Sequence, residues 1–419
     1  MAIQLEIRDP IHGPISVFPD EKRVIDSPYV QRLRGIKQTG FAELAFPGAT
    51  HTRYTHSLGA FYLAGKSFDQ IFKNFPWESS AEKRRLRSCL RMAALLHDVG
   101  HGPLSHAIEQ AMPARKEING QSGQATHEDY TEAIITRSSL ANVLSEVYGD
   151  DFPQAIASLI RAKDQTKDFF KTGSGKNVFP ILSSLISGEL DVDRMDYMAR
   201  DSLYCGTTYG HFDRDWIFSN LLYQEVDGQV FLALDSRALY AFEDFLLSRY
   251  HMYLIVYLHH KSVVYDEMLF QFLKSSSEAT KVPSDLEDYL RVDDHWLWSK
   301  LQASKNPWAK RIIEQEPYKM ILEVKSDQTD EAKKYADALE QKLKDERTSY
   351  FRSSSTGLLS KYASMTKAES FPIYVIYRDP RFISGFKPGI RYELLSEATE
   401  LFDRYQRSRI IDRIYADIR

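Results

Sequence analysis

The sequence predicts a mainly α-helical fold followed by a smaller α+β lobe, and three observations lead to this prediction. Apolar residues recur at helical spacing in several segments of the first two thirds, for example in Glu82–Leu96. Strand-like runs are more frequent later in the chain, as in Phe371–Tyr377. The stretch SSSEATKVPSD, which begins at Ser275, has the composition of a linker. We therefore expect a helical core domain at 1–275 and an α+β lobe at 276–419.

The elements of the core domain follow from periodicity and turn residues. A strand is expected at Ile3–Ile7, and the dipeptide Asp227-Gly228 within YQEVDGQVFLAL predicts a hairpin. Met112–Ala125 lacks periodicity and is expected to be a loop, after which Thr126 and Asp129 form a variant capping box. Helices are expected at Val30–Gln38, Leu58–Phe72, Glu82–Leu96, Tyr130–Tyr148, Pro153–Ala162, Ile181–Ser202 and Leu239–Leu273.

The second part of the chain mixes the two kinds of pattern. Strands are expected at Met320–Val324 and Phe371–Tyr377. Amphipathic helices are expected at Asp330–Glu346 and Glu393–Gln406. Because the two parts differ in character, we expect them to have different roles, with the α+β lobe serving oligomerisation or regulation.

Composition excludes several classes of protein. The 54 basic and 58 acidic residues give a formal net charge of −4, and the absence of a global cationic field argues against a nucleic-acid partner. Cys89 and Cys205 are too few for a disulfide framework. The start, MAIQLEIRDPIHG, lacks the pattern of a signal peptide, and apolar runs stay below the ~18 residues that span a bilayer. We expect a cytoplasmic protein with no membrane association.

Histidines gather around the stretch LHDVGHGPLSH at positions 96–106. Of the 12 histidines, six lie between positions 51 and 127, namely His51, His56, His97, His101, His106 and His127. Grouped with Asp98, their imidazoles suit a divalent ion such as Mn²⁺, Mg²⁺, Fe²⁺, Ni²⁺ or Zn²⁺. Consecutive side chains diverge around a helix, so His97 and Asp98 can bind one ion only where the backbone bends, as Gly100 permits. The alternative is a polar network within the core.

A second acidic cluster, GELDVDRMDYMARD, occupies positions 188–201. On a helix, Asp193, Tyr197, Arg200 and Asp201 would share one face and present a carboxylate, a phenol and a cation. Such a face could meet a metal-bound phosphate. The alternative is a solvated charged face with internal ion pairs.

His56, the pair His97-Asp98 and Asp193 occur in the order H…HD…D, which resembles the HD-domain phosphohydrolase superfamily. The closest resemblance is to its deoxynucleoside triphosphate (dNTP) triphosphohydrolases. The matching strings are DPIHG at 9–13, QRLRGIKQ at 31–38, FPGATHTRYTHSLG at 46–59, LLHDVGHGPLSH at 95–106, the His127-Glu128 pair and DVDRMDYMARD at 191–201. Together they are far more specific than an HD pair alone. Beyond Ser275 the resemblance is weak.

The resemblance implies an HD-domain helical bundle in which His56, His97, Asp98 and Asp193 bind one divalent metal ion. The implied reaction is hydrolysis of a dNTP at the α-phosphorus, which releases a deoxynucleoside and inorganic triphosphate. His106 corresponds to a general acid, with Glu109 as its possible orienting partner. The resemblance also assigns catalytic roles to His101 and His127, with Glu128 steadying His127.

Further positions correspond to substrate contacts in the family. Arg53, Arg194, Tyr197 and Arg249 are implied to contact the triphosphate, together with His101 and His127. Gln38 and Asp201 correspond to residues that bind the 3′-hydroxyl, and Tyr257 to a tyrosine stacked on the sugar. Thr39 departs from the leucine of the vertebrate enzyme, which leaves selectivity for dNTP over NTP open.

A regulatory site is implied at Asp26, Gln31 and Arg34, which coincide with residues that bind an activating guanine nucleotide between subunits. Leu5 departs from the phosphate-binding lysine of that site, and the alternative is that QRLRGIKQ is simply a charged amphipathic helix. If the site exists, nucleotide would stabilise a homo-oligomer, a dimer or a tetramer. Two other functions remain open, an HD hydrolase acting on a nucleoside monophosphate or a cyclic nucleotide, and a non-catalytic nucleotide sensor.

Overall fold

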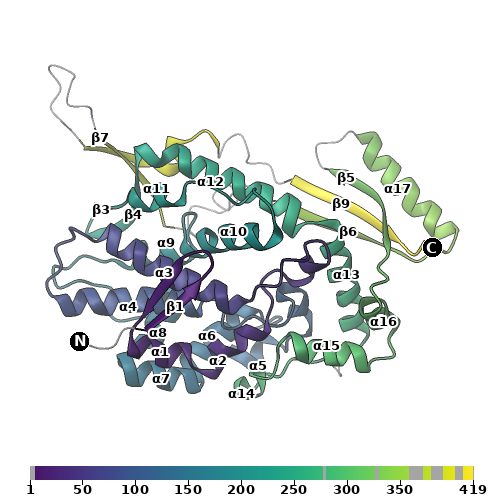
Figure 1. The fold of residues 1–419 in the computed structure, drawn as a ribbon, viewed down its shortest axis with the longest axis horizontal. Helices are drawn as coiled ribbons and strands as arrows, with labels where there is room; N and C mark the ends of the chain where they lie inside the picture. The colour runs from purple at the N-terminus through teal and green to yellow at the C-terminus, as the bar shows by residue number, and fades with distance from the viewer. Residues whose placement is uncertain are drawn as a thin grey trace.

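The computed structural model describes residues 5–276, 280–325, 330–357, 371–378, 390–401 and 409–418. Within these ranges the chain forms a helical body with small sheets at its periphery (Figure 1). The predicted fold class, mainly α with a smaller α+β part, is confirmed. The division at residue 275 remains a prediction, since the main hydrophobic core contains residues from both sides of it, such as Phe61 and Leu301.

The helical body is built from helices of one to five turns. The α-helices before residue 276 are α1 Pro19–Ile25, α2 Pro28–Arg32, α3 Arg53–Ile71, α4 Ser80–Leu96, α5 Arg115–Asn119, α6 His127–Arg137, α7 Ser139–Tyr148, α8 Phe152–Ile160, α9 Phe179–Ser187, α10 Val192–Cys205, α11 Arg214–Ser219, α12 Leu239–Met252 and α13 His260–Ser275. Short 3-10 segments are η1 Leu33–Gly35, η2 Gly40–Leu44, η3 Ser105–Ala111 and η4 Ser236–Ala238, and η5 Tyr253–Tyr257 is a π turn. The later helices are α14 Leu286–Tyr289, α15 Asp294–Ala303, α16 Pro307–Ile313, α17 Asp330–Asp345 and α18 Leu395–Ala398.

The described strands form three small sheets. They are β1 Leu5–Asp9, β2 Gly13–Val17, β3 Leu221–Val226, β4 Gln229–Asp235, β5 Lys319–Lys325, β6 Tyr350–Gly357, β7 Tyr374–Arg378, β8 Ile390–Leu394 and β9 Arg409–Ala416. The orders are β1-β2, β3-β4-β7-β8 and β5-β9-β6, and the pairing of β4 with β7 is parallel while the others are antiparallel. Helix α17 packs against β5 and forms a second, small core with that sheet.

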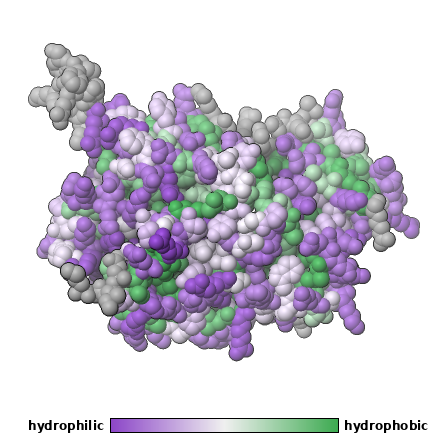
Figure 2. Space-filling model, in the orientation of Figure 1, coloured by the Kyte–Doolittle hydropathy of each residue, from purple (hydrophilic) through white to green (hydrophobic). Residues whose placement is uncertain are grey.

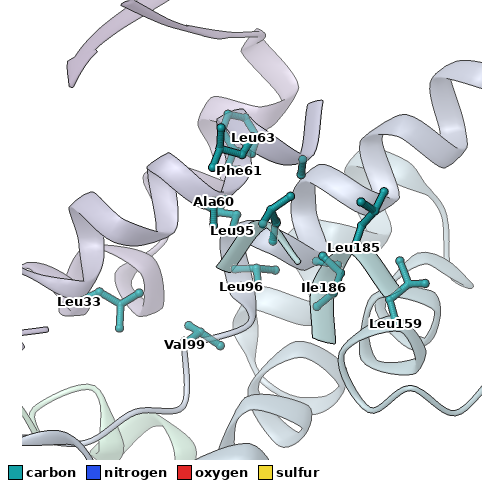
Figure 3. Packing of buried hydrophobic residues seen from close by; sticks show 14 of the residues in the cluster. Leu33, Ala60, Phe61, Leu63, Leu95, Leu96, Val99, Leu159, Leu185 and Ile186 are labelled. Carbon is teal, nitrogen blue, oxygen red and sulfur yellow. The ribbon is translucent and has the colours of Figure 1, made fainter. Parts of the chain in front are cut away.

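The main core lies directly beneath the histidine-rich segment. Helix α3 packs against α4 and α10, and α4 packs against α8 and α9. Figure 3 shows aliphatic side chains from these helices converging on the end of α4, including Ala60, Leu95, Leu96, Leu159 and Leu185. These buried apolar contacts stabilise the end of α4, from which the next residue, His97, leaves the core.

The surface is mixed in character. On the face in Figure 2, hydrophilic and hydrophobic residues are interspersed. Among the described residues, no helix combines the length and apolar character needed to cross a bilayer.

Several predicted helices are wrong in their extent. The predicted helix Ile181–Ser202 is two helices, α9 and α10. A Cβ on Gly188 would lie 2.3 Å from the Ser184 carbonyl oxygen, so only glycine fits the tight exit from α9. The Asp191 carboxylate then accepts a hydrogen bond from the Arg194 amide at 2.8 Å and caps α10.

The other long predicted helices are also interrupted. Tyr130–Tyr148 is divided into α6 and α7 at Ser138, whose hydroxyl accepts a bond from the Leu140 amide at 3.1 Å. The predicted helix Leu239–Leu273 is α12, the π turn η5 and α13. Val30–Gln38 is helical only through α2 and η1, after which Lys37 forms a bridge with Thr52.

Predictions from turn and capping residues were more accurate than predictions of helix length. The hairpin at Asp227-Gly228 is confirmed, and its two residues have φ of 52° and 74°, as a type I′ turn requires. The capping box of Thr126 and Asp129 is also confirmed. The expected loop Met112–Ala125 is partly wrong because it contains α5.

At the C-terminal end, the expected helix Glu393–Gln406 begins as strand β8 and continues as α18, and 402–408 lies outside the described residues.

Candidate metal centre and active-site cavity

Three ligand atoms from distant segments converge at the end of α4. The His56 Nε2 and His97 Nε2 atoms lie 3.3 Å apart. The Asp193 Oδ1 atom lies 3.0 Å from the first and 3.5 Å from the second. His56 comes from the first turn of α3, His97 follows α4 and Asp193 belongs to the first turn of α10. Among the described residues, this group is the one whose ligand atoms could hold a metal ion.

Hydrogen bonds at the far side of each ring orient the two imidazoles. His97 Nδ1 donates to the Ala94 carbonyl oxygen at 2.8 Å, and a carbonyl can only accept, so the Nε2 atom of neutral His97 carries a lone pair. His56 Nδ1 lies 2.8 Å from Asp196 Oδ2, and the ionised carboxylate keeps the proton on Nδ1. Both Nε2 atoms therefore point into the group, and each carries a lone pair when its ring is neutral.

The separations match the requirements of a divalent cation. With metal–ligand bonds of about 2.1 Å, neighbouring ligands of an octahedral or tetrahedral ion lie about 3.0–3.4 Å apart. The three observed separations run from 3.0 to 3.5 Å. Two imidazoles and a carboxylate thus fit a divalent metal, although nitrogen and oxygen ligands alone do not select one metal.

Asp98 lies beside this group. Its Oδ1 atom is 3.4 Å from His97 Nε2, and its Oδ2 atom is 3.8 Å from His56 Nε2 while accepting a hydrogen bond from Arg53 Nη1. Asp98 therefore connects the metal group to the nearest cation. Its expected role as a fourth ligand remains a prediction.

The pKa values of the group depend on two opposing effects, burial and the neighbouring opposite charges. Burial disfavours a charged His56, but the Asp193 and Asp196 carboxylates outweigh it and raise the pKa of His56 to about 10. Asp98 and Asp193 likewise overcome burial and raise the pKa of His97. The same pairing holds the pKa of Asp193 below its ordinary value despite burial. Without a cation, protonated imidazole offsets the charge of the ionised carboxylates.

The metal group opens into a cavity of about 530 Å³. Residues from α3, α6, α8, α9, α10, α12 and α13, together with the segments between them, form its wall. Most of the predicted site residues line it, namely Gln38, Arg53, His97, Asp98, His101, His127, Glu128, Asp193, Arg194, Tyr197, Asp201, Arg249 and Tyr257, while His56 lies fully buried behind it.

The arginines of the cavity are held by acidic partners. Arg194 Nη1 bonds Asp191 Oδ2 at 2.7 Å and also the Gly188 carbonyl oxygen. Arg249 Nη1 bonds Glu189 Oε1 at 3.0 Å. Sequence reasoning missed these partners, both of which come from the turn between α9 and α10. Fixed, paired guanidiniums are preorganised donors for an anionic ligand.

A stacked pair of histidines forms another part of the wall. The rings of His101 and His127 lie 3.8 Å apart at 18°. Burial, with the Arg53 guanidinium nearby, lowers the pKa of His101 well below its ordinary value and keeps the ring neutral. His127 Nδ1 pairs with Glu109 Oε1.

The expectation that Glu128 steadies His127 is wrong. Glu128 instead accepts a bond from Arg161 Nη1 at 2.8 Å, because adjacent helical side chains diverge. Arg161 is a cavity residue that sequence reasoning missed. His106 lies on η3, and the position of its side chain is outside the described part of the structure.

Comparison with known proteins agrees with this geometry. The HD domain model matches residues 53–201, the range that contains His56, His97, Asp98 and Asp193, and the model of the HD associated region matches residues 217–349. The chain belongs to the HD-domain family of phosphohydrolases. Its HD domain thus supplies both the metal group and most of the cavity.

Relatives of the HD protein include uncharacterised and named proteins. It is 33% identical to the uncharacterized protein YwfO of Bacillus subtilis, over 71% of this chain and 65% of that protein. It is 31% identical to the deoxynucleoside triphosphate triphosphohydrolase SAMHD1 homolog of Dictyostelium discoideum (72% and 55%) and 29% identical to human SAMHD1 (75% and 54%). The matches span between about half and two thirds of these curated relatives.

Solved structures extend the likeness over the whole chain. A hypothetical protein from Aquifex aeolicus is 27% identical with a TM-score of 0.75, covering 99% of this chain and 97% of that one. A phosphohydrolase from Bacteroides thetaiotaomicron is 25% identical with a TM-score of 0.69, and the match covers 100% of both chains.

Behind the metal group, the HD domain contains a buried ionic network. Asp196 Oδ1 lies 2.6 Å from His12 Nε2, and Arg200 donates to both oxygens of Asp196 at 2.8 and 2.9 Å. Arg200 also donates to Asp9 at 2.9 Å. A Cβ on Gly59 would lie 1.8 Å from Asp196 Oδ1, so a glycine is needed where α3 meets α10.

This network shows that the predicted face of α10 was wrong in one residue, and it explains the DPIHG motif. Arg200, predicted to face a phosphate beside Asp193, is fully buried and points the other way. DPIHG contributes Asp9 and His12 to the back of the HD site, and that motif was the available signal for their importance.

The residues expected at the sugar come together on one wall of the cavity. Asp201 accepts a bond from Tyr257 Oη at 2.7 Å and lies 2.7 Å from His51 Nε2. The Gln38 backbone amide donates a hydrogen bond to the His51 carbonyl oxygen at 3.0 Å. The next residue, Thr39, also lines the cavity. His51, which had no assigned role, links Gln38 to Asp201.

The residues expected at the regulatory site are not among those that line the cavity. Gln31 bonds the Ile25 carbonyl oxygen at 2.8 Å, Arg34 bonds Gln31 at 2.8 Å, and Asp26 pairs with Lys22. Their binding of a nucleotide remains a prediction.

Proposed function

We propose that this protein is a metal-dependent dNTP triphosphohydrolase, which hydrolyses a dNTP at the α-phosphorus to a deoxynucleoside and inorganic triphosphate. The observation that carries the proposal is one cavity combining the metal group with the Arg53, Arg194 and Arg249 guanidiniums and the pair Asp201–Tyr257. Such a cavity offers sites for a phosphate chain and a sugar. The names of the SAMHD1 relatives support the same substrate class.

His56, His97 and Asp193, with Asp98 beside them, would hold the divalent ion. When bound, the ion would supply positive charge at the reacting phosphate and lower the pKa of a coordinated water. Arg53, bonded to Asp98 and to Ser105, would present its guanidinium to the same phosphate. Burial raises the pKa of Tyr197 well above its ordinary value, so its neutral hydroxyl would donate to phosphate oxygens.

In the proposed step, the oxygen of water bonds to the α-phosphorus while the bond from that phosphorus to O5′ breaks. The attacking water gives up a proton, and O5′ receives one, so the products are a neutral deoxynucleoside and triphosphate. His106 is the proposed proton donor, since imidazole titrates near neutral pH. The Glu109–His127 pair, stacked on His101, would orient donors around the triphosphate.

The test is a product assay on the purified full chain. It is incubated with each dNTP and each NTP and with Mn²⁺ or Mg²⁺, in parallel with a chelator-treated sample, and triphosphate is separated from pyrophosphate and orthophosphate. We expect triphosphate and deoxynucleoside, and none in the chelated sample. Release of orthophosphate alone would overturn the proposal, and no turnover with any metal would favour a nucleotide sensor.

The regulatory predictions belong to the same assay. We propose that residues 276–419 contribute to a homo-oligomer and that a guanine nucleotide at Asp26, Gln31 and Arg34 activates it. An added arm with GTP tests activation through the reaction rate. Light scattering with and without GTP tests the homo-oligomer through its mass. Unchanged rate and mass on adding GTP would contradict activation.

A further inference from the structure

A segment outside the HD domain contacts the backbone of the turn that follows the HD pair. Tyr289, at the end of α14, donates a hydrogen bond from its hydroxyl to the Gly100 carbonyl oxygen at 2.8 Å. Asp294, the first residue of α15, accepts a bond from the Leu104 amide at 3.1 Å. The histidine-rich turn is therefore held from a region distant in sequence, which belongs to the HD associated region.

Asp294 holds a second loop at the same time. Its other oxygen accepts a bond from the Lys37 amide at 3.0 Å. The residue is buried, with 5% of its surface exposed. One carboxylate thus ties together two loops, 37–40 and 99–105, and each loop contributes residues to the wall of the candidate cavity.

The loop at 99–105 needs such a support because of its backbone. Leu104 and Ser105 have φ of 52° and 60°, the left-handed conformation that side-chain-bearing residues rarely adopt. Two such residues in succession persist only where the surroundings hold them. The bond from the Leu104 amide to Asp294 is one such restraint.

The strained turn leads directly to the phosphate-facing side chains. Ser105 accepts a bond from Arg53 Nη2 at 2.7 Å, and Arg53 Nη1 bonds Asp98. A continuous path of contacts therefore runs from Asp294 through Leu104 and Ser105 to Arg53.

We propose that Asp294 is a positioning residue that sets the Arg53 guanidinium and the loop of Gln38 for the reaction. Its effect on turnover rests on the proposed function, whereas its effect on the two loops does not. It is not among the described residues of the metal group or of the cavity lining, and it acts through the two loops whose amides it binds.

The test compares Asp294→Asn with Asp293→Asn in the full chain. In the first variant, the asparagine keeps the size of the side chain but can accept only one of the two amide bonds through its single carbonyl oxygen. Asp293 is the N-cap of α15 and accepts a bond from the Trp296 amide at 2.9 Å, a role that asparagine fills equally well. The second variant thus matches the charge change at the neighbouring position without loosening either loop.

Hydrogen exchange of backbone amides is the first measurement. In Asp294→Asn we expect exchange in 37–40 and 99–105 to rise about tenfold, with no rise in Asp293→Asn. Tyr289→Phe, which loses the bond to Gly100 and keeps both bonds of Asp294, should raise exchange in 99–105 alone. Equal exchange in Asp294→Asn and Asp293→Asn would overturn the proposal, whether or not the protein hydrolyses dNTPs.

Kinetics and metal binding are the second measurement. We expect Asp294→Asn to lower kcat about tenfold, with KM and the Mn²⁺ affinity changed less than about threefold, because the path from Asp294 ends at Arg53 and not at the metal group. A loosened loop with unchanged kcat would overturn the positioning role. Absence of dNTP turnover in the parent protein would defeat the proposed function and leave the exchange result to decide the inference.

Discussion

Helix α10 has two acidic faces, and they differ in how completely their charges are paired. On the back face, Asp196 and Arg200 are fully buried, and every bond of the Asp196 carboxylate goes to His12, His56 or Arg200. On the cavity face, the Asp193 side chain is 34% exposed and faces the Nε2 atoms of two imidazoles. The back face resembles a closed structural network, and the cavity face resembles an open binding site.

His56, on α3, contacts both faces of α10 and so connects them. Its Nδ1 atom bonds Asp196 on the back face, and its Nε2 atom meets Asp193 on the cavity face. The buried network therefore fixes the direction of a metal-binding lone pair. Removing a partner from the back face should weaken the fold first, whereas removing a partner from the cavity face should weaken chemistry first.

The largest expected effect is on the cavity face. Asp193→Ala should lose bound metal and lower kcat/KM by about 10⁴-fold or more, because the charge that offsets the cation is removed. The fold should be retained, with Tm within a few degrees of the parent value. Metal analysis, steady-state kinetics and thermal circular dichroism measure the three quantities. Normal turnover by this variant would contradict the assigned site.

On the back face, Asp196→Asn should act mainly on stability. It removes one of the two carboxylates that the described structure pairs with the buried Arg200 guanidinium, the other being Asp9, which should lower the free energy of unfolding by about 3–5 kcal/mol. Metal affinity should fall about 10- to 100-fold as His56 loses its orientation. Urea unfolding and calorimetry with Mn²⁺ measure both. Asp193→Asn is the matched control, and equal destabilisation by the two variants would refute the contrast.

The pH dependence of metal binding tests how the two faces meet at His56. The pKa of His56 rises from about 6.5 in the unfolded chain to about 10 in the metal-free fold. Its contribution to stability is therefore complete below pH 6.5 and is lost as the pH rises through 10.

A cation must displace this proton, so the apparent metal affinity should rise by up to tenfold per pH unit for each proton released within that window. Calorimetry with Mn²⁺ between pH 6.5 and 8.5 measures it. An affinity independent of pH would show that His56 is already deprotonated.

The contrast between the faces also marks what the sequence could predict. The family resemblance carried by the order of His56, His97, Asp98 and Asp193 predicted the three residues whose ligand atoms converge, and Asp98 lies beside them. The face of Arg200 was not predictable. Positions 193 and 200 lie within about 20° on a helix, and the long guanidinium turns to the nearest buried carboxylates.

Helix boundaries failed for a related reason. The apolar periodicity runs on through Gly188 and Ser138, but steric contact at the first and a hydroxyl cap at the second end the helices there. The partner of His127 was missed because Glu109 is 18 positions away, whereas the adjacent Glu128 points elsewhere. Long-range pairing of this kind follows from tertiary packing and not from local pattern.

The smallest expected effect concerns that pair of glutamates and distinguishes the glutamate that holds His127 from the one that holds Arg161. Glu109→Gln removes the charge that holds His127 and should lower kcat/KM about tenfold. Glu128→Gln should change it less than about threefold, because the Glu128 side chain is 60% exposed and bonds Arg161 rather than a histidine. Both variants lose one negative charge, so each controls for the other, and Tm should be similar in the two. A larger loss in Glu128→Gln would mean that Arg161 and its carboxylates, and not the Glu109–His127 pair, hold the ligand at this end of the cavity.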